Sequence, residues 1–211
     1  MSQAWPAKPA IVTADEWQKL RSELLAAEKQ ATRELDALAA RRRRLPMAEF
    51  DTGYTFATPD GPRTLLDLFD GRSQLALYQF MDRGPDEFCQ GCTAFAANIP
   101  EAGPERLAAR DVTWVMASDM PLPQIQAYRE RMGWTMPFVS SHGTTFTRDC
   151  GVGGGFLLSV FLRDGDQVYR TYTTTSRGVD RLLWVHSILD LTPYGRQQAW
   201  EDSPEGWPQT Y

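Results

Sequence analysis

Several features that mark common classes of protein are scarce in this sequence. It contains 2 histidines and 3 cysteines among 211 residues, too few thiols for a fold built on disulfides. No apolar run approaches the ~20 residues that a membrane-spanning helix needs. The net charge of −5 is opposite in sign to most nucleic-acid-binding surfaces. These absences argue against a membrane or a nucleic acid as a partner.

The N-terminal stretch "MSQAWPAKPAIVTADEW" lacks the apolar core of a secretory signal, so we expect a cytoplasmic protein. In that reducing compartment a close pair of cysteines is more often catalytic or metal-binding than structural. The remaining composition, 42% hydrophobic and 23% charged, is typical of a soluble globular protein. We expect an N-terminal helical extension (1–46), a core domain (47–196) and a C-terminal tail (197–211).

The pattern over residues 13–44 predicts one long helix. Thr13 and Glu16 have the spacing of a capping box, and Pro46 stops the helix after the basic run Arg41–Arg44. We take this run as C-terminal capping, with a nucleic-acid contact as the alternative. Apolar residues recur in steps of three and four and form one stripe: Trp17, Leu20, Leu24, Ala27, Ala31, Leu35 and Leu38. We expect the stripe to cover the core domain, a second copy of the chain, or both, and predict a homodimer through this helix.

The rest of the chain predicts an α/β domain. Its expected elements are a strand at 54–57, a buried strand at 75–81, a helix after the cysteine pair, a buried strand at 111–118, an amphipathic helix at 121–133, a short strand from Pro137, a hairpin turning at Asp164-Gly165 and a closing helix at 178–191. The closing helix should bury Leu182, Leu183, Val185, Ile188 and Leu189, with His186 as a core histidine. This order is that of the thioredoxin fold, a mixed central sheet with helices on both faces. We interpret "GVGGG" at 151–155 as a flexible connector.

The segment "FCQGCTAF" places Cys89 and Cys92 where a central strand gives way to a helix. Unpaired amides and the dipole at a helix N-terminus stabilise a thiolate, which is the reactive form of cysteine. Cys92, one turn further on, can then attack a mixed disulfide formed on Cys89. The same pair can instead reduce a peroxide through a sulfenic acid.

Other residues are candidates for binding the substrate. Pro137 would open a strand beside the pair, and a proline there is often cis and leaves a backbone edge free, although an ordinary trans proline fits the pattern too. Thr93 could hydrogen-bond a sulfur or have no such role, and Arg83, in the loop before the pair, is the third candidate. Cys150 is a candidate third redox thiol, but a free buried cysteine is the commoner case.

A family resemblance accompanies these motifs. "GRSQLALYQFM", the Cys-x-x-Cys, "RDVTWVMAS", "RMGWTMPFVSS", "TYTTTSRGVDRL" and "LDLTPYGR" resemble bacterial thioredoxin-like proteins of the domain-of-unknown-function 899 type, related to the AhpC/TSA antioxidant branch. The resemblance spans nearly the whole chain and implies the fold and a redox pair at Cys89 and Cys92. This chain has Phe-Cys-Gln-Gly-Cys where the family typically has Gly-Cys-Pro-Ser-Cys, so the direction of the redox reaction stays open.

We favour a thiol-disulfide oxidoreductase without a cofactor, acting on a disulfide-bearing protein or a small molecule and recharged by a thiol reductant. A thiol peroxidase acting on a peroxide is the nearest alternative. Its weakness is the loop before the pair, because Pro85 is followed by Asp86 and Glu87 rather than by a threonine or serine. The two carboxylates would raise the thiol pKa, and Arg83 would offset them.

Two further alternatives remain open. A zinc site would need His142 or Cys150 to complete the ligand set of Cys89 and Cys92, and we predict no metal because a single Cys-x-x-Cys is a weak signal. A redox-inactive binding protein would use the fold without the thiol chemistry.

Overall fold

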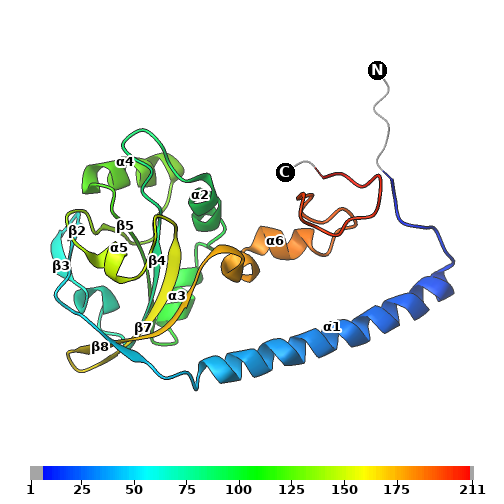
Figure 1. Cartoon of the computed structure of the whole chain (residues 1–211), viewed down its shortest axis with the longest axis horizontal. Coiled ribbons are helices and arrows are strands. Elements are labelled where there is room, and N and C mark those ends of the chain that lie inside the picture. The colour runs from blue at the N-terminus through cyan, green and yellow to red at the C-terminus, as the bar shows by residue number, and fades with distance from the viewer. Residues whose placement is uncertain (1–6, 210–211) are drawn as a thin grey trace. The chain divides into compact units, whose positions relative to one another are not determined.

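The computed structural model describes residues 7–209, which divide into two compact units. One unit combines the chain before residue 46 with the chain after residue 183, and the other is the continuous segment 46–183 (Figure 1). The chain therefore leaves the first unit to form the second and then returns to complete the first.

The first unit contains the long predicted helix, α1 (Ala14–Arg42). Its start is fixed by Thr13, whose side-chain oxygen accepts a hydrogen bond from the Glu16 amide at 3.3 Å. Asp15 and Glu16 lie in its first turn, and basic residues lie in its last turn, as the helix dipole favours. The Ala7 amide donates to the Gly206 carbonyl at 3.2 Å and so joins the two chain segments of this unit.

The second unit is built on one eight-stranded sheet in the order β1-β8-β7-β4-β5-β6-β2-β3. The strands are β1 (Ala48–Phe50), β2 (Thr55–Thr58), β3 (Gly61–Thr64), β4 (Gln74–Gln79), β5 (Val112–Ser118), β6 (Phe138–Ser140), β7 (Leu157–Asp164) and β8 (Gln167–Thr174). The helices are α2 (Gln90–Ala97), α3 (Gly103–Ala108), α4 (Leu122–Met132) and α5 (Phe146–Asp149), with 3-10 turns at Asp67–Phe69 and Ser176–Leu182.

The centre of this sheet has the predicted thioredoxin topology. β4 pairs parallel with β5 through a crossover that contains α2, and it pairs antiparallel with β7 of the β7–β8 hairpin. Both faces of the sheet are covered by other parts of the chain. Each strand contributes to both faces, because its alternate side chains point to opposite sides. Leu75 and Leu77 of β4 join one buried cluster, and Tyr78 and Phe80 join the other.

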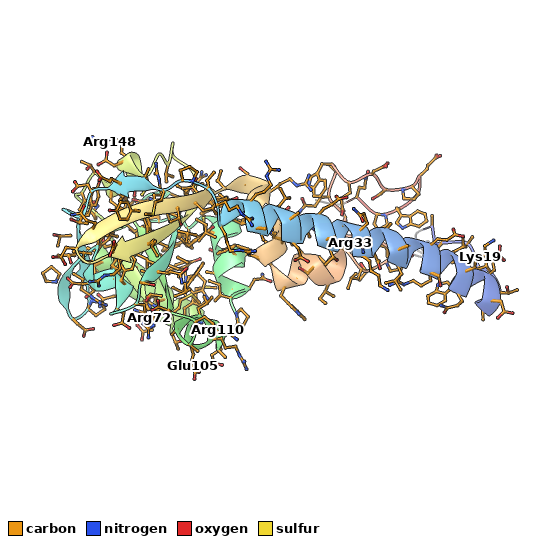
Figure 2. All side chains as sticks on the ribbon, turned by 90° about the horizontal axis from the view of Figure 1, so that it is seen from below. Lys19, Arg33, Arg72, Glu105, Arg110 and Arg148 are labelled. Atoms are coloured by element: carbon orange, nitrogen blue, oxygen red, sulfur yellow. The ribbon has the colours of Figure 1, made fainter. Side chains whose placement is uncertain are left out.

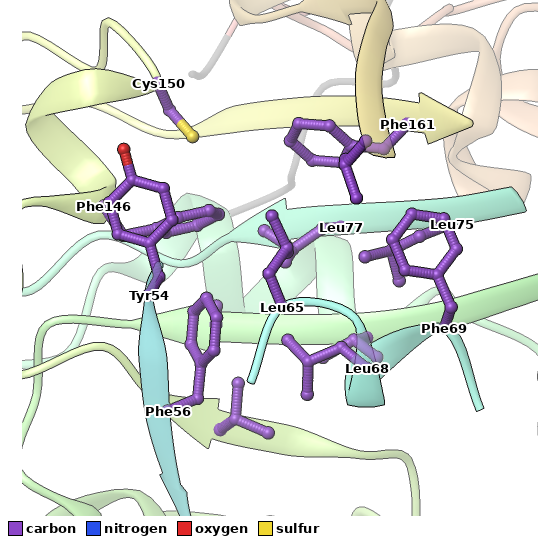
Figure 3. Close-up of a cluster of buried hydrophobic side chains, with 14 of the residues drawn as sticks. Tyr54, Phe56, Leu65, Leu68, Phe69, Leu75, Leu77, Phe146, Cys150 and Phe161 are labelled. Carbon is purple, nitrogen blue, oxygen red and sulfur yellow. The ribbon is translucent and has the colours of Figure 1, made fainter. Parts of the chain in front are cut away.

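The two faces carry different parts of the chain. The Leu77 face is packed by α5, by the 3-10 turn at Asp67–Phe69 and by strand β2 (Figure 3). The Tyr78 face is packed by α2 and α4, which bring Cys92 and Tyr128 into contact with the sheet. The Cys89–Cys92 pair and Cys150 therefore belong to opposite faces.

The predicted closing helix is wrong in its extent and its burial. Leu183 adopts an extended conformation, with φ −92° and ψ 110°, and separates the 3-10 turn from α6 (Trp184–Leu189), which belongs to the first unit. Leu183 is buried, but Leu182, Val185 and Ile188 are 41–47% exposed, and no residue of α6 is buried. Because the backbone leaves helical geometry at Leu183, the apolar residues on its two sides do not form one face. His186 is accordingly half-buried in α6 rather than in the core.

Candidate functional site

The cysteine pair lies where the chain leaves the central strand β4 and enters α2. The connecting loop is closed by an isolated bridge between Asp82 and Phe88, and α2 begins at Gln90. Cys89 is the N-cap of α2, and its Sγ accepts a hydrogen bond from the Cys92 amide at 3.3 Å. The sulfur thus occupies the position that a serine or aspartate oxygen takes in an ordinary N-cap.

The two thiols differ in access to solvent. Cys89 is half-buried beside the exposed residues Gln90 and Gly91, whereas Cys92 is 0% exposed. Burial raises the pKa of the Cys92 thiol to about 12, and hydrogen bonds from the Met81 backbone and from Tyr78 only partly oppose that effect. Cys92 is therefore a protonated thiol near neutral pH, and Cys89 is the sulfur that a substrate can reach.

Tyr78 of β4 contacts the buried thiol of Cys92, a role that the sequence did not suggest. Its hydroxyl lies within hydrogen-bonding reach of Cys92, and burial raises its own pKa. Its ring stacks on Phe95 of α2, with centroids 4.2 Å apart and an interplanar angle of 11°. The sequence signal that could have placed Tyr78 near the cysteines is the alternation along β4, which puts Tyr78 and Phe80 on one face of the sheet.

Helix α4 contacts the loop before Cys89 (residues 82–88). The contacts come from one face of the helix, which carries Gln124, Tyr128 and Arg131. Gln124 Nε2 donates to the Gly84 carbonyl at 2.8 Å and to the Pro85 carbonyl at 3.3 Å. The Tyr128 ring stacks on Phe88 at 3.6 Å and 7°, and the Arg131 guanidinium lies 4.8–4.9 Å from both ring centroids. The residue before the reactive cysteine is therefore fixed by aromatic stacking.

Thr93 links this face of α4 to Cys89. Its hydroxyl is 2.8 Å from the Cys89 carbonyl, to which it donates, and 2.5 Å from the Tyr128 hydroxyl. The suggested bond from Thr93 to a sulfur is thus replaced by one to the backbone of the cysteine. Position i+4 in a helix brings a threonine hydroxyl to that carbonyl, which is the physical reason for the difference.

Removing either hydroxyl of this network should slow the reaction of Cys89. Thr93→Val or Tyr128→Phe removes about 1 kcal/mol of hydrogen bonding that fixes the first turn of α2, which corresponds to roughly a fivefold slower alkylation. The rate of Cys89 alkylation by iodoacetamide at pH 7 measures this effect. Thr93→Ser keeps the hydroxyl and should react at the wild-type rate; an equally fast Thr93→Val variant would contradict the prediction.

Pro137 does not open the strand next to β4. It precedes β6, which lies on the far side of β5, and its peptide bond is trans because residues 7–209 contain no cis bond. The other strand beside β4 is β7, which the chain enters through Gly153-Gly154-Gly155-Phe156. The ring of Phe156 lies against that of Tyr78, with centroids 5.7 Å apart. The extra strand β6 explains the difference, since the sequence order alone did not reveal that the sheet extends beyond β5.

The segment before Pro137 nevertheless borders a groove beside α2. The groove has a volume of about 400 Å³. It is lined by Ala96, Ala97, Ile99, Glu101, Met132, Gly133, Trp134, Thr135 and Met136. Its walls combine two thioethers and an indole with a carboxylate, a surface that can hold a mixed apolar and polar ligand.

Arg83 forms an ion pair within the loop that precedes the cysteine pair. Its guanidinium pairs with Glu87 at 3.1 Å, and both side chains are largely exposed. Asp86 in the same loop is also exposed. An exposed pair of this kind contributes little to stability, but it reduces the negative charge that Glu87 presents near the thiols.

Cys150 and His142 lie away from the pair. Cys150 caps α5 on the Leu77 face, where its thiol points into the aromatic cluster and burial raises its pKa to about 12 (Figure 3). His142 Nδ1 is 2.9 Å from the Asp119 carbonyl. Neither residue approaches the pair to complete a zinc site, and residues 7–209 contain no group of three or more His, Cys, Asp or Glu side chains arranged to hold a metal.

A mixed sheet with this topology and a Cys-x-x-Cys at the start of α2 define a thioredoxin-like protein. The family described as "Bacterial protein of unknown function (DUF899)" matches residues 6–210, and the chain belongs to this family. No curated protein matches the chain significantly in sequence. Within residues 7–209, helices of the length and apolarity needed to cross a membrane are absent.

Solved structures with a similar fold include proteins of two redox classes. The peroxidoxin BcpB from Mycobacterium tuberculosis is 19% identical, with a TM-score of 0.46 over 63% of this chain and 88% of its own. PrxQ from Xylella fastidiosa is 12% identical, with a TM-score of 0.45 over 65% and 93%. A secreted M. tuberculosis disulfide oxidoreductase homologous to E. coli DsbE is 17% identical, with a TM-score of 0.41 over 61% and 90%. These structures resemble this chain only distantly.

Proposed function

We propose that this protein is a thiol-disulfide oxidoreductase in which Cys89 is the nucleophile and Cys92 the resolving thiol. The observation that carries the proposal is the hydrogen bond from the Cys92 amide to Cys89 Sγ at 3.3 Å. This bond places the half-buried sulfur of Cys89, at the N-terminus of α2, one helical turn before the thiol-bearing residue Cys92. A donor aimed at the sulfur stabilises the thiolate more than the thiol.

The first step is attack of the Cys89 thiolate on one sulfur of a substrate disulfide. The new bond joins Cys89 Sγ to that sulfur, the substrate S–S bond breaks, and the other substrate sulfur leaves as a thiolate that takes up a proton. The attacking sulfur is held at the N-cap of α2, where it accepts the hydrogen bond from the Cys92 amide.

The second step uses the buried thiol. Cys92 attacks Cys89 Sγ, the mixed disulfide breaks, and the second substrate sulfur leaves and takes the proton that Cys92 loses. The substrate gains two electrons, and the protein is left with a Cys89–Cys92 disulfide that a separate thiol reductant must reduce. The high pKa of Cys92 suits this order, because the resolving thiol stays protonated until the mixed disulfide has formed. Tyr78 is placed to hydrogen-bond the sulfur as its proton leaves.

The groove beside α2 supports a peptide-sized substrate. Met132, Met136 and Trp134 provide adaptable apolar contacts next to the helix that carries the pair. A peroxide is much smaller than this groove and gains no contact from it. We therefore place a disulfide-bearing protein ahead of a small peroxide as the substrate.

The proposal is tested by mass spectrometry of alkylated thiols in the full-length protein. Reduced protein is exposed in parallel to a disulfide-bearing peptide and to hydrogen peroxide, and free thiols are then alkylated under denaturing conditions. We expect the peptide to produce a Cys89–Cys92 disulfide while Cys150 stays free. A pair oxidised quickly by peroxide but inert to the peptide would instead establish the peroxidase, and a pair inert to both would overturn redox function.

A further inference from the structure

Helix α1 carries an apolar seam with a strict seven-residue repeat. Trp17, Leu24, Ala31 and Leu38 follow one another at intervals of seven, and Leu20 and Ala27 each lie three residues after a member of that series. This is the a and d pattern by which two helices pack together. The seam is therefore of the kind that another helix covers.

No residue of α1 is buried, although the helix is 29 residues long. The large apolar side chains of the seam are 43–56% exposed: Trp17, Leu20, Leu24 and Leu38. Lys19 and Arg33, which are labelled in Figure 2, each lie two residues after a member of the seven-residue series and therefore on the polar side of the helix. Most of the stability of such a helix comes from packing its apolar face, so α1 needs a partner along its length.

The charges of α1 favour one orientation of a partner with the same sequence. The first turn holds Asp15 and Glu16, and the basic run Arg41–Arg44 follows the last turn. Two parallel copies would place basic run against basic run and Glu34 against Glu34 at a d position of the seam. Two antiparallel copies place each acidic end beside a basic end and also oppose the two helix dipoles favourably.

We propose that α1 pairs with the α1 of a second copy of this chain, antiparallel, about a two-fold axis near the middle of the helix. In this register Leu20 lies opposite the partner's Leu38, Ala27 opposite the partner's Ala31, and Trp17 opposite the partner's Arg41. The contact is self-complementary, so each pairing occurs twice. The small alanines bring the backbones close at the centre. The next layer places Leu24 beside the partner's Glu34, and Leu20 packs on the partner's Leu38 further out. The proposal does not depend on the redox function.

Orientation and register are tested with cysteines introduced into the full chain. Ala27→Cys and Ala31→Cys are each made in a Cys89→Ser background and oxidised mildly, separately and after mixing with subunit exchange. We expect covalent dimers in the mixture and almost none in either variant alone, because identical positions then lie beyond the ~7 Å that a disulfide spans. Efficient cross-linking of each variant alone would show a parallel pair and overturn the proposal.

The dimer itself is tested by light scattering on the wild-type protein. We expect twice the 23.8 kDa of one chain, and a single-chain mass for the Leu20→Asp/Leu24→Asp variant. Ala26→Asp introduces the same residue on the polar face of α1 and should leave the dimer intact. A monomeric wild type would mean that the seam is covered within one chain, and a dimer that survives Leu20→Asp/Leu24→Asp would place the interface elsewhere; either result overturns the proposal.

Discussion

Cys92→Ser should convert the protein from a catalyst into a trap. Cys89 keeps its position at the N-cap of α2 and still attacks a disulfide, because the hydrogen bond it accepts comes from the backbone amide of residue 92. The resolving thiol is gone, so the mixed disulfide persists and turnover with a peptide disulfide falls by at least about a thousandfold, the scale of losing a catalytic nucleophile. Intact-mass measurement should find one substrate molecule linked to Cys89.

Cys89→Ser is the matched control for the trap. It should form no adduct and show no turnover, since Cys92 is buried with a pKa of about 12. Cys150→Ser should retain both activities, because that thiol lies on the other face of the sheet. Adduct formation by the Cys89→Ser variant would reverse the roles that we assign to the two cysteines.

The reduced protein should lose stability steeply above pH 9. Burial raises the pKa of both Cys92 and Cys150 from a usual value near 9.0 to about 12. Between these pH values the unfolded chain releases thiol protons that the folded chain retains. The free energy of unfolding therefore falls as the pH rises through this window, and the stability that the thiols contribute is complete below pH 9. Two such thiols give a slope of up to about 2.7 kcal/mol per pH unit.

Urea denaturation of the reduced protein from pH 8 to pH 11 measures this slope. Cys150→Ala and Cys92→Ala should each lower the baseline stability but reduce the slope by about half. Burial also raises the pKa of Tyr54, to about 12, and that of Tyr78, so these two phenols add to the slope only above pH 10. A slope that is unchanged in both variants would show that the buried thiols do not govern alkaline unfolding.

The sequence predicted those features that local chemistry decides. The helix cap at Thr13, the buried strand before the cysteine pair and the turn at Asp164-Gly165 all depend on residues close together in the chain. The order of elements was sufficient for the thioredoxin topology because parallel strands require crossovers and hairpins pair locally. The position of Cys89 follows from the same order.

Contacts between distant segments were missed. Tyr128 meets Thr93 across 35 positions, and no spacing rule connects α4 to the residue after the cysteine pair. The sequence left both a cis and a trans Pro137 open, and it could not show that strand β6, which Pro137 precedes, lies beyond β5 in the sheet. The apolar residues after Leu183 resembled a core helix, but one extended residue ended that face.

The division of the chain has a consequence for biosynthesis. Residues 46–183 form an uninterrupted unit, whereas the other unit needs both ends of the polypeptide, as the bond between Ala7 and Gly206 illustrates. Because domains fold as units while the ribosome is still working, the second unit can fold once residue 183 has emerged. The contact of Ala7 with Gly206 can form only after residue 206 has emerged, so a ribosome that stalls before it would carry a folded second unit while the two segments of the first unit are still unjoined.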